Sequence, residues 1–405
     1  MTSSQSKTNQ ATGRRVLLIR QAYYPGNLRF KDQAEKLADE GNQVVVLSLR
    51  RPGEPRKEIH GGITIYRVPF SWIRHGLVLF ALQYALFLLI AFGFATIECL
   101  RRRVDAVLVS NLPDILVFCA VIPKIMGKRL ILDIRDPLPE LLATRYGLKS
   151  TSPLCKIAVL EEKIGCWFAD GVLTVHEPIR RLLENRGVPP EKLWVLYNFP
   201  DSKEFYLRST SRPGSASGTG PQLIFHGTIA HRFGIDTAIE AVRDLRKTCP
   251  GVHLSIYGEG EALSYLKQLA RDEGVDDCVA FHGFQPASII AQALSKADIA
   301  VIPHRRTPGM DIVLPTKLLE SMACGLPAVV SKSPVMEELL PENTVRYFVA
   351  GDAAGLTEAI LGLSKHPDVA RKVASSALTW LSEFRECRYQ REFADWVLFG
   401  DPARA

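Results

Sequence analysis

The sequence of 405 residues lacks the features that mark several special classes of protein. Its eight cysteines are scattered without a Cys-x-x-Cys pair, which predicts reduced thiols and a cytoplasmic setting. The first dozen residues contain no apolar stretch, so we expect no cleaved secretory signal. There is no long basic run with interleaved aromatic residues, and the net charge of +7 is mild, so nucleic acid is not an expected partner. A phosphate-bearing ligand or an anionic membrane surface fits this charge better.

Apolar residues make up 47% of the chain, enough to bury the cores of roughly two or three domains. Short apolar runs alternate with helix-like segments along the chain, which is typical of parallel sheets covered by helices on both faces. The expected strands are 16–19, 44–47, 63–68, 106–109, 129–133, 171–175, 193–197, 222–225, 253–257, 279–281, 299–302 and 327–330. Because ligands bind beyond the carboxyl ends of such strands, we predict an α/β fold of two Rossmann-like domains whose sheets face an interdomain cleft.

A stretch rich in serine, glycine and threonine, STSRPGSASGTG at 209–220, marks the expected boundary between the two domains. We predict a disordered tail over residues 1–13 and an N-terminal domain over 14–205. A linker over 206–220 and a C-terminal domain over 221–380 follow. The last residues, 381–405, are expected to form a helix that crosses back to the N-terminal domain.

A run of 22 residues without a formal charge, 76–97, is followed by Arg101, Arg102 and Arg103. As a helix it would be about 33 Å long, enough to cross a bilayer. The strands on either side of it are assigned to one sheet, and a spanning segment would place them on opposite sides of the membrane. We therefore expect a helix that lies in the cytoplasmic membrane interface, so that the protein is peripheral and monotopic. A helix inside the domain core is the alternative.

The segment VLPTKLLESMACGLPAVV at 313–330 reads as a loop, a helix and a buried strand. Lys317 lies in the first turn of that helix, where free amides and the helix dipole already favour an anion such as a diphosphate. Glu320, one turn further, has the chemistry to accept both hydroxyls of a ribose. An ordinary amphipathic helix explains the same spacing equally well.

This segment resembles the donor-site signature of the family 4 glycosyltransferases, enzymes of the two-Rossmann GT-B fold. Further similar segments follow one another in the order expected, and the likeness covers the chain beyond the first dozen residues. They are DIRDPLPE at 133–140, ADGVLTVHEPIRRLL at 169–183, VLYNFPD at 195–201, HGTIAHRFGIDTAIEAV at 226–242 and SIYGEGE at 255–261.

The resemblance implies a donor site in the C-terminal domain. Gly227 would form the turn that opens this domain, and Arg232 and Lys317 would neutralise the diphosphate of the donor. We assign Leu318 and Glu320 to the same site. Fixed cations in a dry cleft stabilise the charge that grows on a departing diphosphate.

Two further features bear on the donor. Gly258 and Gly260 resemble a loop that lets the backbone approach the nucleotide. The family often has a second glutamate eight positions before Glu320, where this chain has Ile312 beside Asp311. Either Asp311 takes over from a shifted loop, or backbone amides near Gly309 contact the sugar.

In the N-terminal domain, DIRD places Asp133, Arg135 and Asp136 just past an expected strand. Asp136 is predicted to orient or deprotonate an acceptor hydroxyl and Arg135 to bind a phosphate, with a buried Asp–Arg salt bridge as the alternative. Glu140 and His176 are weaker candidates.

Other N-terminal candidates come from the loop after the first strand and from the end of the domain. Gly26 occupies the place of a glycine loop that resembles the family's approach to the sugar and the leaving phosphate. Asn27 is assigned to the acceptor, and Arg29 is within reach of it. Asn198 resembles the asparagine found where the family's chain passes between domains, with a simple turn residue as the alternative.

The reading favoured by the sequence is a retaining glycosyltransferase that uses a nucleotide-diphosphate sugar, expected to be a UDP-sugar. A membrane-associated, polyprenyl-diphosphate-linked acceptor of polysaccharide biosynthesis is the expected partner. No cofactor or metal is expected, since no Asp-x-Asp pair lies where a metal-dependent donor loop would be. The alternatives are a nucleotide-sugar epimerase of the same fold and a catalytically silent membrane-bound partner.

Overall fold

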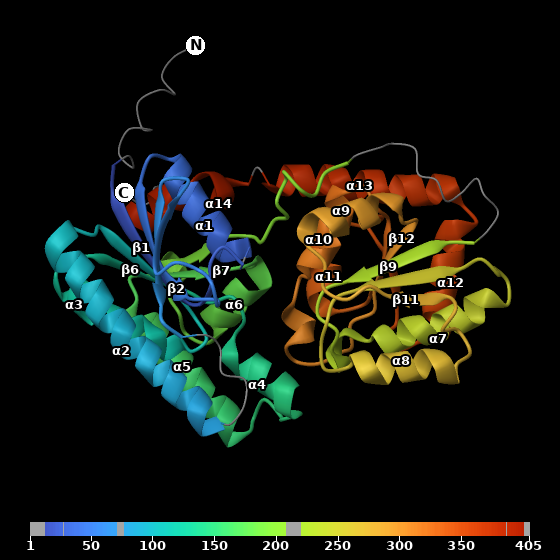
Figure 1. Ribbon diagram of the computed structural model, residues 1–405, viewed down its shortest axis with the longest axis horizontal. Helices are drawn as coiled ribbons and strands as arrows, with labels where there is room; N and C mark the ends of the chain where they lie inside the picture. Colours follow the sequence, from blue (N-terminus) through green and yellow to red (C-terminus); the bar gives the residue numbers. More distant parts are fainter. Residues whose placement is uncertain (1–12, 27, 71–76, 208–219, 386, 401–405) are drawn as a thin grey trace, which may run out of the picture. The chain divides into compact units, whose positions relative to one another are not determined.

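The computed structural model describes residues 13–26, 28–70, 77–207, 220–385 and 387–400 in two compact units (Figure 1). The first unit comprises Met1–Asn198 and Cys387–Ala405, and the second comprises Phe199–Glu386. The first unit ends before the boundary expected at 205, because Phe205 is buried in the core of the second. Most of the expected tail and of the expected linker, residues 1–12 and 208–219, lie outside the described residues.

The sheet of the first unit has the strand order β3-β4-β2-β1-β5-β6-β7-β8. All neighbouring strands are parallel except β3 and β4. The strands are β1 (Arg15–Tyr23), β2 (Gln43–Leu49), β3 (Lys57–His60), β4 (Ile63–Val68), β5 (Ala106–Ser110), β6 (Arg129–Asp133), β7 (Gly171–Thr174) and β8 (Leu193–Val195). Each of the seven strands expected from apolar runs is confirmed, and the antiparallel edge strand β3 stands where we expected a crossover between β2 and β4.

Helices cover this sheet, and the last two helices of the described chain belong to this unit although they follow the second unit in sequence. The helices are α1 (Leu28–Asp39), α2 (Leu77–Arg102), η1 (Asp114–Ala120), α3 (Val121–Ile125), α4 (Leu138–Tyr146), α5 (Pro153–Phe168), α6 (Glu177–Asn185) and η2 (Pro190–Lys192). Residues 381–405 do not form one helix: α13 (Pro367–Arg385) belongs to the second unit, and α14 (Arg388–Arg391) and α15 (Phe393–Phe399) belong to the first. Trp396 of α15 stacks on Trp194 with 5.5 Å between ring centroids.

Helix α2 contains the apolar run and has two different faces. Phe87, Ala91 and Ala95 are fully buried. On the opposite face Leu82 is 59% exposed and Leu89 is 69% exposed among the described residues. By length and composition, the span Leu82–Arg102 is one that could cross a membrane, and 33% of its most apolar window is buried. Helix α2 therefore packs one face into the core of the unit and leaves its other face exposed.

A cluster of acidic side chains lies where η1 packs against α5 in the first unit. Asp114, at the start of η1, is fully buried, and burial together with the nearby Glu162 and Glu161 raises its pKa to about 8. Burial also raises the pKa of Glu162 to about 7, although Arg186 lies within 2.9 Å of its Oε1 and opposes that shift. Arg186 also pairs with Glu140. Arg186 thus forms ion pairs with both Glu140 and Glu162.

We expect Asp114→Asn to raise the thermal stability of the protein above pH 8. Because the folded pKa of Asp114 is above its ordinary value, ionisation favours the unfolded state, and stability falls as pH rises from about 4 towards 8. The asparagine side chain cannot ionise, so the variant avoids this loss of stability. Its melting temperature at pH 9 should be about 2–4 °C above that of the natural protein. The exposed Asp39→Asn serves as control. Equal melting temperatures of Asp114→Asn and the natural protein at pH 9 would contradict this expectation.

The second unit has an all-parallel sheet in the order β11-β10-β9-β12-β13-β14. Its strands are β9 (Gln222–His226), β10 (His253–Tyr257), β11 (Val279–Phe281), β12 (Ile299–Ile302), β13 (Ala328–Ser331) and β14 (Arg346–Phe348). Its helices are η4 (His231–Phe233), α7 (Ile235–Arg246), α8 (Leu263–Asp272), α9 (Ala287–Lys296), η5 (Met310–Ile312), α10 (Thr316–Ala323), α11 (Pro334–Leu339), α12 (Ala353–Ser364) and α13. The five expected strands are confirmed, and β14 adds an edge strand.

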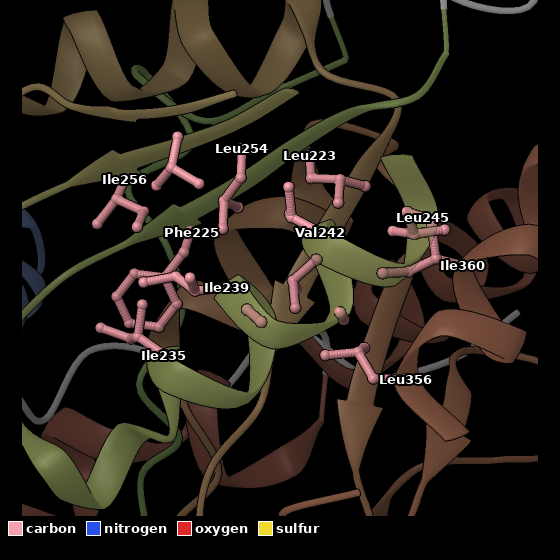
Figure 2. Close-up of a cluster of buried hydrophobic side chains, with 14 of the residues drawn as sticks. Leu223, Phe225, Ile235, Ile239, Val242, Leu245, Leu254, Ile256, Leu356 and Ile360 are labelled. Atoms are coloured by element: carbon pink, nitrogen blue, oxygen red, sulfur yellow. The ribbon is translucent and has the colours of Figure 1, made fainter. Parts of the chain in front are cut away.

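One hydrophobic core of this unit lies between α7 and the sheet. Figure 2 shows Ile235, Ile239 and Val242 of α7 facing Phe225 and Leu254 of the strands. The apolar positions of α7 are three or four residues apart, so they share one face of the helix. This packing fixes the start of α7, and with it the loop that joins it to β9.

Candidate functional site

Two loops meet beyond the carboxyl ends of β9 and β10, where parallel sheets bind ligands. The amide of Gly227 donates to the carbonyl of Tyr257 at 2.9 Å, and the amide of Ile229 donates to that of Glu259 at 2.9 Å. Gly258 has a φ of 138°, and a Cβ there would be 1.8 Å from the carbonyl oxygen of Gly227. The predicted glycines therefore hold two backbones in direct contact.

Lys317 lies in the first turn of α10 and points at the turn that follows β9. Its Nζ is 4.1 Å from the ring centroids of both Phe225 and Phe233. It is buried and has no hydrogen-bond partner among the described residues. A Cβ at Gly227 would be 3.3 Å from this Nζ, so glycine leaves the ammonium close to the exposed turn.

The environment of Lys317 weakens its hold on a proton. Its pKa is lowered to about 7, mainly by burial and also by Arg232, while Glu320 acts in the opposite direction. The two ring faces favour the ammonium form as well. An arriving anion would reverse the effect of burial, so binding of a diphosphate here should be accompanied by proton uptake near neutral pH.

Arg232 reaches the same place from η4. It is exposed, and its guanidinium carbon is 4.7 Å from the centroid of the Phe233 ring that Lys317 also contacts. The structure therefore brings together the two cations that the sequence assigned to one site. Because like charges this close repel, the pair is best satisfied by an anion with more than one charge.

Glu320 is less available than predicted. Its Oε2 is 2.6 Å from Nε2 of His226, at the end of β9, and both side chains are buried. His226 therefore holds one oxygen of the carboxylate that we expected to accept two ribose hydroxyls. The assignment of Leu318 to the donor site needs correction, because its side chain is fully buried in the core and its amide donates to the carbonyl of Pro315 at 3.0 Å.

Asp311 does not present a free carboxylate in place of the missing glutamate at Ile312. Nε of Arg306 is 2.5 Å from its Oδ1, and Nη2 is 3.0 Å from its Oδ2. Each oxygen thus accepts one hydrogen bond from Arg306 and keeps further acceptor capacity. Both alternatives, Asp311 and the backbone amides near Gly309, stay predictions for the sugar contact.

Phe233 and His304 lie at this site but were not found from the sequence. His304 lies two residues after β12, is 5% exposed, and has no hydrogen-bond partner for either ring nitrogen among the described residues. Its ring centroid is 5.0 Å from that of Phe233. Burial, then Lys317 and Arg232, holds its pKa well below the usual value, so the imidazole is neutral. Its position just after a buried strand is the signal that could have singled it out.

In the first unit, a buried salt bridge joins Asp133 of DIRD to Arg29, outside that segment, whereas the alternative reading concerned Asp136 and Arg135. Nη2 of Arg29 is 2.7 Å from Oδ1 of Asp133, and Nε2 of Gln33 donates to its Oδ2 at 3.0 Å. Arg29 also donates to Oδ1 of Asn198 at 2.9 Å. These residues fix the carboxyl edge of the sheet, and Arg29 and Asn198 act there as structural residues.

Asp136 remains exposed at the same edge of the sheet, on a loop held by Asn111. The Nδ2 of Asn111 donates to the carbonyl of Asp136 at 2.9 Å, and its Oδ1 accepts from the amide of Arg135 at 3.3 Å. Burial lowers the pKa of Arg135, while Asp136 and Asp133 act to raise it. The loop thus presents a carboxylate beside a partly buried cation.

Most of the other residues predicted for the first unit are exposed or have structural roles. Gly26 is exposed, and Asn27 lies outside the described residues. His176 caps α6, accepting from the amide of Ile179 at 3.4 Å. Glu140 pairs with Arg186. Among residues whose placement the structure gives, no group of three or more His, Cys, Asp or Glu side chains could hold a metal ion.

Two family models match the chain, one in each unit. Residues 26–198 match the model described as a glycosyl transferase 4-like domain, and residues 220–366 match the one described as glycosyl transferases group 1. The amylovoran biosynthesis glycosyltransferase AmsK of Erwinia amylovora is 29% identical over 225 residues, which cover 54% of this chain and 54% of AmsK. The chain thus spans about half the length of this curated relative.

Solved structures with a similar fold cover nearly the whole chain. Sucrose-phosphate synthase from Thermosynechococcus elongatus has a TM-score of 0.72 at 17% identity, covering 91% of this chain and 94% of its own. HepE of Anabaena in complex with UDP-glucose has a TM-score of 0.68 at 16% identity, covering 94% and 98%. At these identities the likeness shows the fold alone, which is the predicted GT-B fold of two Rossmann-like domains.

Proposed function

The chain belongs to the family 4 glycosyltransferases, and from this premise we propose that it transfers a sugar from a nucleotide-diphosphate donor to a lipid-linked acceptor in polysaccharide biosynthesis. One observation carries the proposal for the donor. Arg232 and the buried Lys317 meet at the Phe233 ring, beside the exposed turn at Gly227. Two cations at such a turn suit a diphosphate.

The chemistry proposed for this site needs no metal. The bond between the anomeric carbon and the β-phosphate oxygen breaks, and its electron pair stays on the departing nucleoside diphosphate. Lys317 and Arg232 stabilise the charge that develops there. The acceptor oxygen bonds to the anomeric carbon and passes its proton to a base, for which the carboxylate of Asp136 is the candidate. The family resemblance favours retention of the anomeric configuration, through attack on the face from which the diphosphate departs.

A screen of nucleotide sugars would identify the base and the sugar of the donor. UDP-sugars are the first candidates, since HepE, which shares the fold, is described in complex with UDP-glucose. GDP- and dTDP-sugars are the comparison set. Transfer should be followed as nucleoside diphosphate released from purified protein with and without a polyprenyl-diphosphate-linked sugar. Binding without turnover across the set would favour a silent partner, and an isomeric nucleotide sugar would favour an epimerase.

The first unit is proposed to bind the acceptor on the cytoplasmic face of the membrane. The exposed leucines of α2 and Arg101 and Arg102 at its end suit an interfacial helix, with the apolar face in the lipid and the cations near anionic headgroups. A lipid-linked acceptor is held at that interface by its own chain. This places the acceptor's sugar end within reach of a peripheral enzyme.

We expect Asp136→Asn to slow transfer without weakening the donor site. The exposed carboxylate of Asp136 is the proposed base or orienting group for the acceptor hydroxyl, and the amide cannot take its proton. The turnover number should fall about 100-fold or more, while donor affinity measured by calorimetry stays unchanged. A rate close to that of the natural protein would assign Asp136 to loop structure.

A further inference from the structure

A second apolar surface lies on α5, apart from the hydrophobic run that the sequence made obvious. Five large side chains, at intervals of three or four residues, form one stripe along this helix: Leu154, Ile157, Leu160, Ile164 and Trp167. Ile157 is 63% exposed, and Trp167 is 77% exposed. Scattered apolar residues need no explanation, but a continuous stripe on one helix marks an interaction surface.

The charges around this apolar stripe have one sign. The exposed side chains of α5 are all apolar except for two lysines, Lys156 and Lys163. The two acids of the helix are engaged elsewhere, since Oε1 of Glu161 accepts from the amide of Ile115 at 3.1 Å and Glu162 pairs with Arg186. From Leu141 to Trp167 no exposed position carries an acidic side chain.

The stripe lies on the same part of the first unit as the exposed face of α2. Helices α2 and α5 both pack against η1, and Figure 1 shows them along one side of the unit. Ile115 of η1, 46% exposed, adds an apolar side chain at the element that joins them. Among the described side chains of α2, the exposed ones are apolar or arginine, as on α5.

We propose that α5 is a second membrane-docking helix, which inserts its apolar stripe into an anionic bilayer while Lys156 and Lys163 contact the headgroups. A second copy of the chain suits the surface less well, because a two-fold contact would bring these lysines against each other. Anionic lipid complements both the apolar stripe and its basic borders. Trp167 at the helix end suits the headgroup level. The inference rests on the proposed function for its acceptor, but its test does not.

The test measures binding of the full chain to vesicles without any substrate. Vesicles of phosphatidylcholine with roughly one-third phosphatidylglycerol are compared with phosphatidylcholine alone. The double variant Ile157→Ser, Leu160→Ser should bind the anionic vesicles at least ~10-fold more weakly, since both side chains leave the lipid. Phe284→Ser with Val349→Ser, at positions 75% and 62% exposed on the second unit, should bind as the natural protein does.

Two further variants separate the apolar and charged parts of the surface. Lys156→Glu with Lys163→Glu should weaken binding to anionic vesicles while leaving binding to neutral ones nearly unchanged. Brominated lipid should quench the fluorescence of the natural protein, and Trp167→Phe should bind equally well but lose most of that quenching. Thermal melting should show that each variant is folded.

Vesicle binding that is unchanged in the Ile157→Ser, Leu160→Ser variant would overturn the inference. So would a lipid-free dimer, seen by sedimentation, that the same variant abolishes, because the stripe would then belong to a second copy. The proposed function fails separately, if no donor supports transfer although vesicle binding still depends on α5.

Discussion

Replacing Lys317 by methionine should abolish transfer while leaving the second unit as stable as before or more so. The ammonium is the buried cation of the proposed diphosphate site, and its loss should lower kcat/KM by about 100- to 1000-fold. Methionine has a similar length and no charge, so it can lie between the rings of Phe225 and Phe233, where the ammonium has no hydrogen-bond partner among the described side chains and backbone. A catalytic defect caused by unfolding would instead appear with lower stability.

The pH dependence gives a second readout for this variant. Burial holds the folded pKa of Lys317 near 7, below its ordinary value, so the charged side chain disfavours folding. That effect is complete below about pH 7 and disappears as pH rises towards about 10. The gain in melting temperature of Lys317→Met over the natural protein should therefore shrink between pH 7 and pH 10. Lys267→Met is a control, because Lys267 lies on the surface of the same unit beside Phe281. Retained turnover in Lys317→Met would remove Lys317 from the donor site.

Gly258→Ala should destabilise the second unit strongly and remove nucleotide binding with it. The new Cβ would be 1.8 Å from the carbonyl oxygen of Gly227, at a φ of 138° that alanine rarely adopts. Because the obstacle is backbone, it can move only if the turn beside Lys317 moves. We expect a loss of about 3–5 kcal/mol in the free energy of unfolding.

A second glycine of the same unit separates strain from collision. Gly274 has a φ of 66°, and a Cβ there would meet nothing within 4 Å. Gly274→Ala should therefore cost only about 1 kcal/mol, and should bind nucleotide normally. Urea titration measures both losses, and calorimetry with the preferred nucleoside diphosphate measures binding. Equal losses in the two variants would mean that the contact with Gly227 does not constrain the turn.

The fold was predictable because its signal is local. Each buried parallel strand is a short run of apolar residues, and the expected runs became strands of the two sheets. The edge strands β3 and β14 escaped, since Lys57–His60 and Arg346–Phe348 are short and partly exposed. These two edge strands carry little of the apolar pattern on which the prediction depends, whereas the edge strands β8 and β11 carry enough of it to be found.

The site was predictable only where residue type and position in an element coincide. Lys317 was found because a lysine in the first turn of a helix has a physical meaning by itself. The ring of Phe233, which both cations contact, depends on how η4 packs against α10, and no spacing encodes that. The partner of Asp133 is likewise Arg29, which lies 104 residues earlier in the chain. Sequence alone did not show that Asp133, rather than Asp136, is the aspartate of this segment that forms a buried salt bridge.

The stacking of Trp396 on Trp194 makes the first unit discontinuous in the chain. Nε1 of Trp194 also donates to the carbonyl of Tyr389 at 3.1 Å, so the closing segment is bonded as well as packed. During synthesis, the ribosome releases residues 387–399 only after the whole second unit has been made. The first unit must therefore wait, with the Trp194 side of its sheet uncovered, while the second can fold at once. An N-terminal fragment that ends at the linker would keep that side exposed to water permanently.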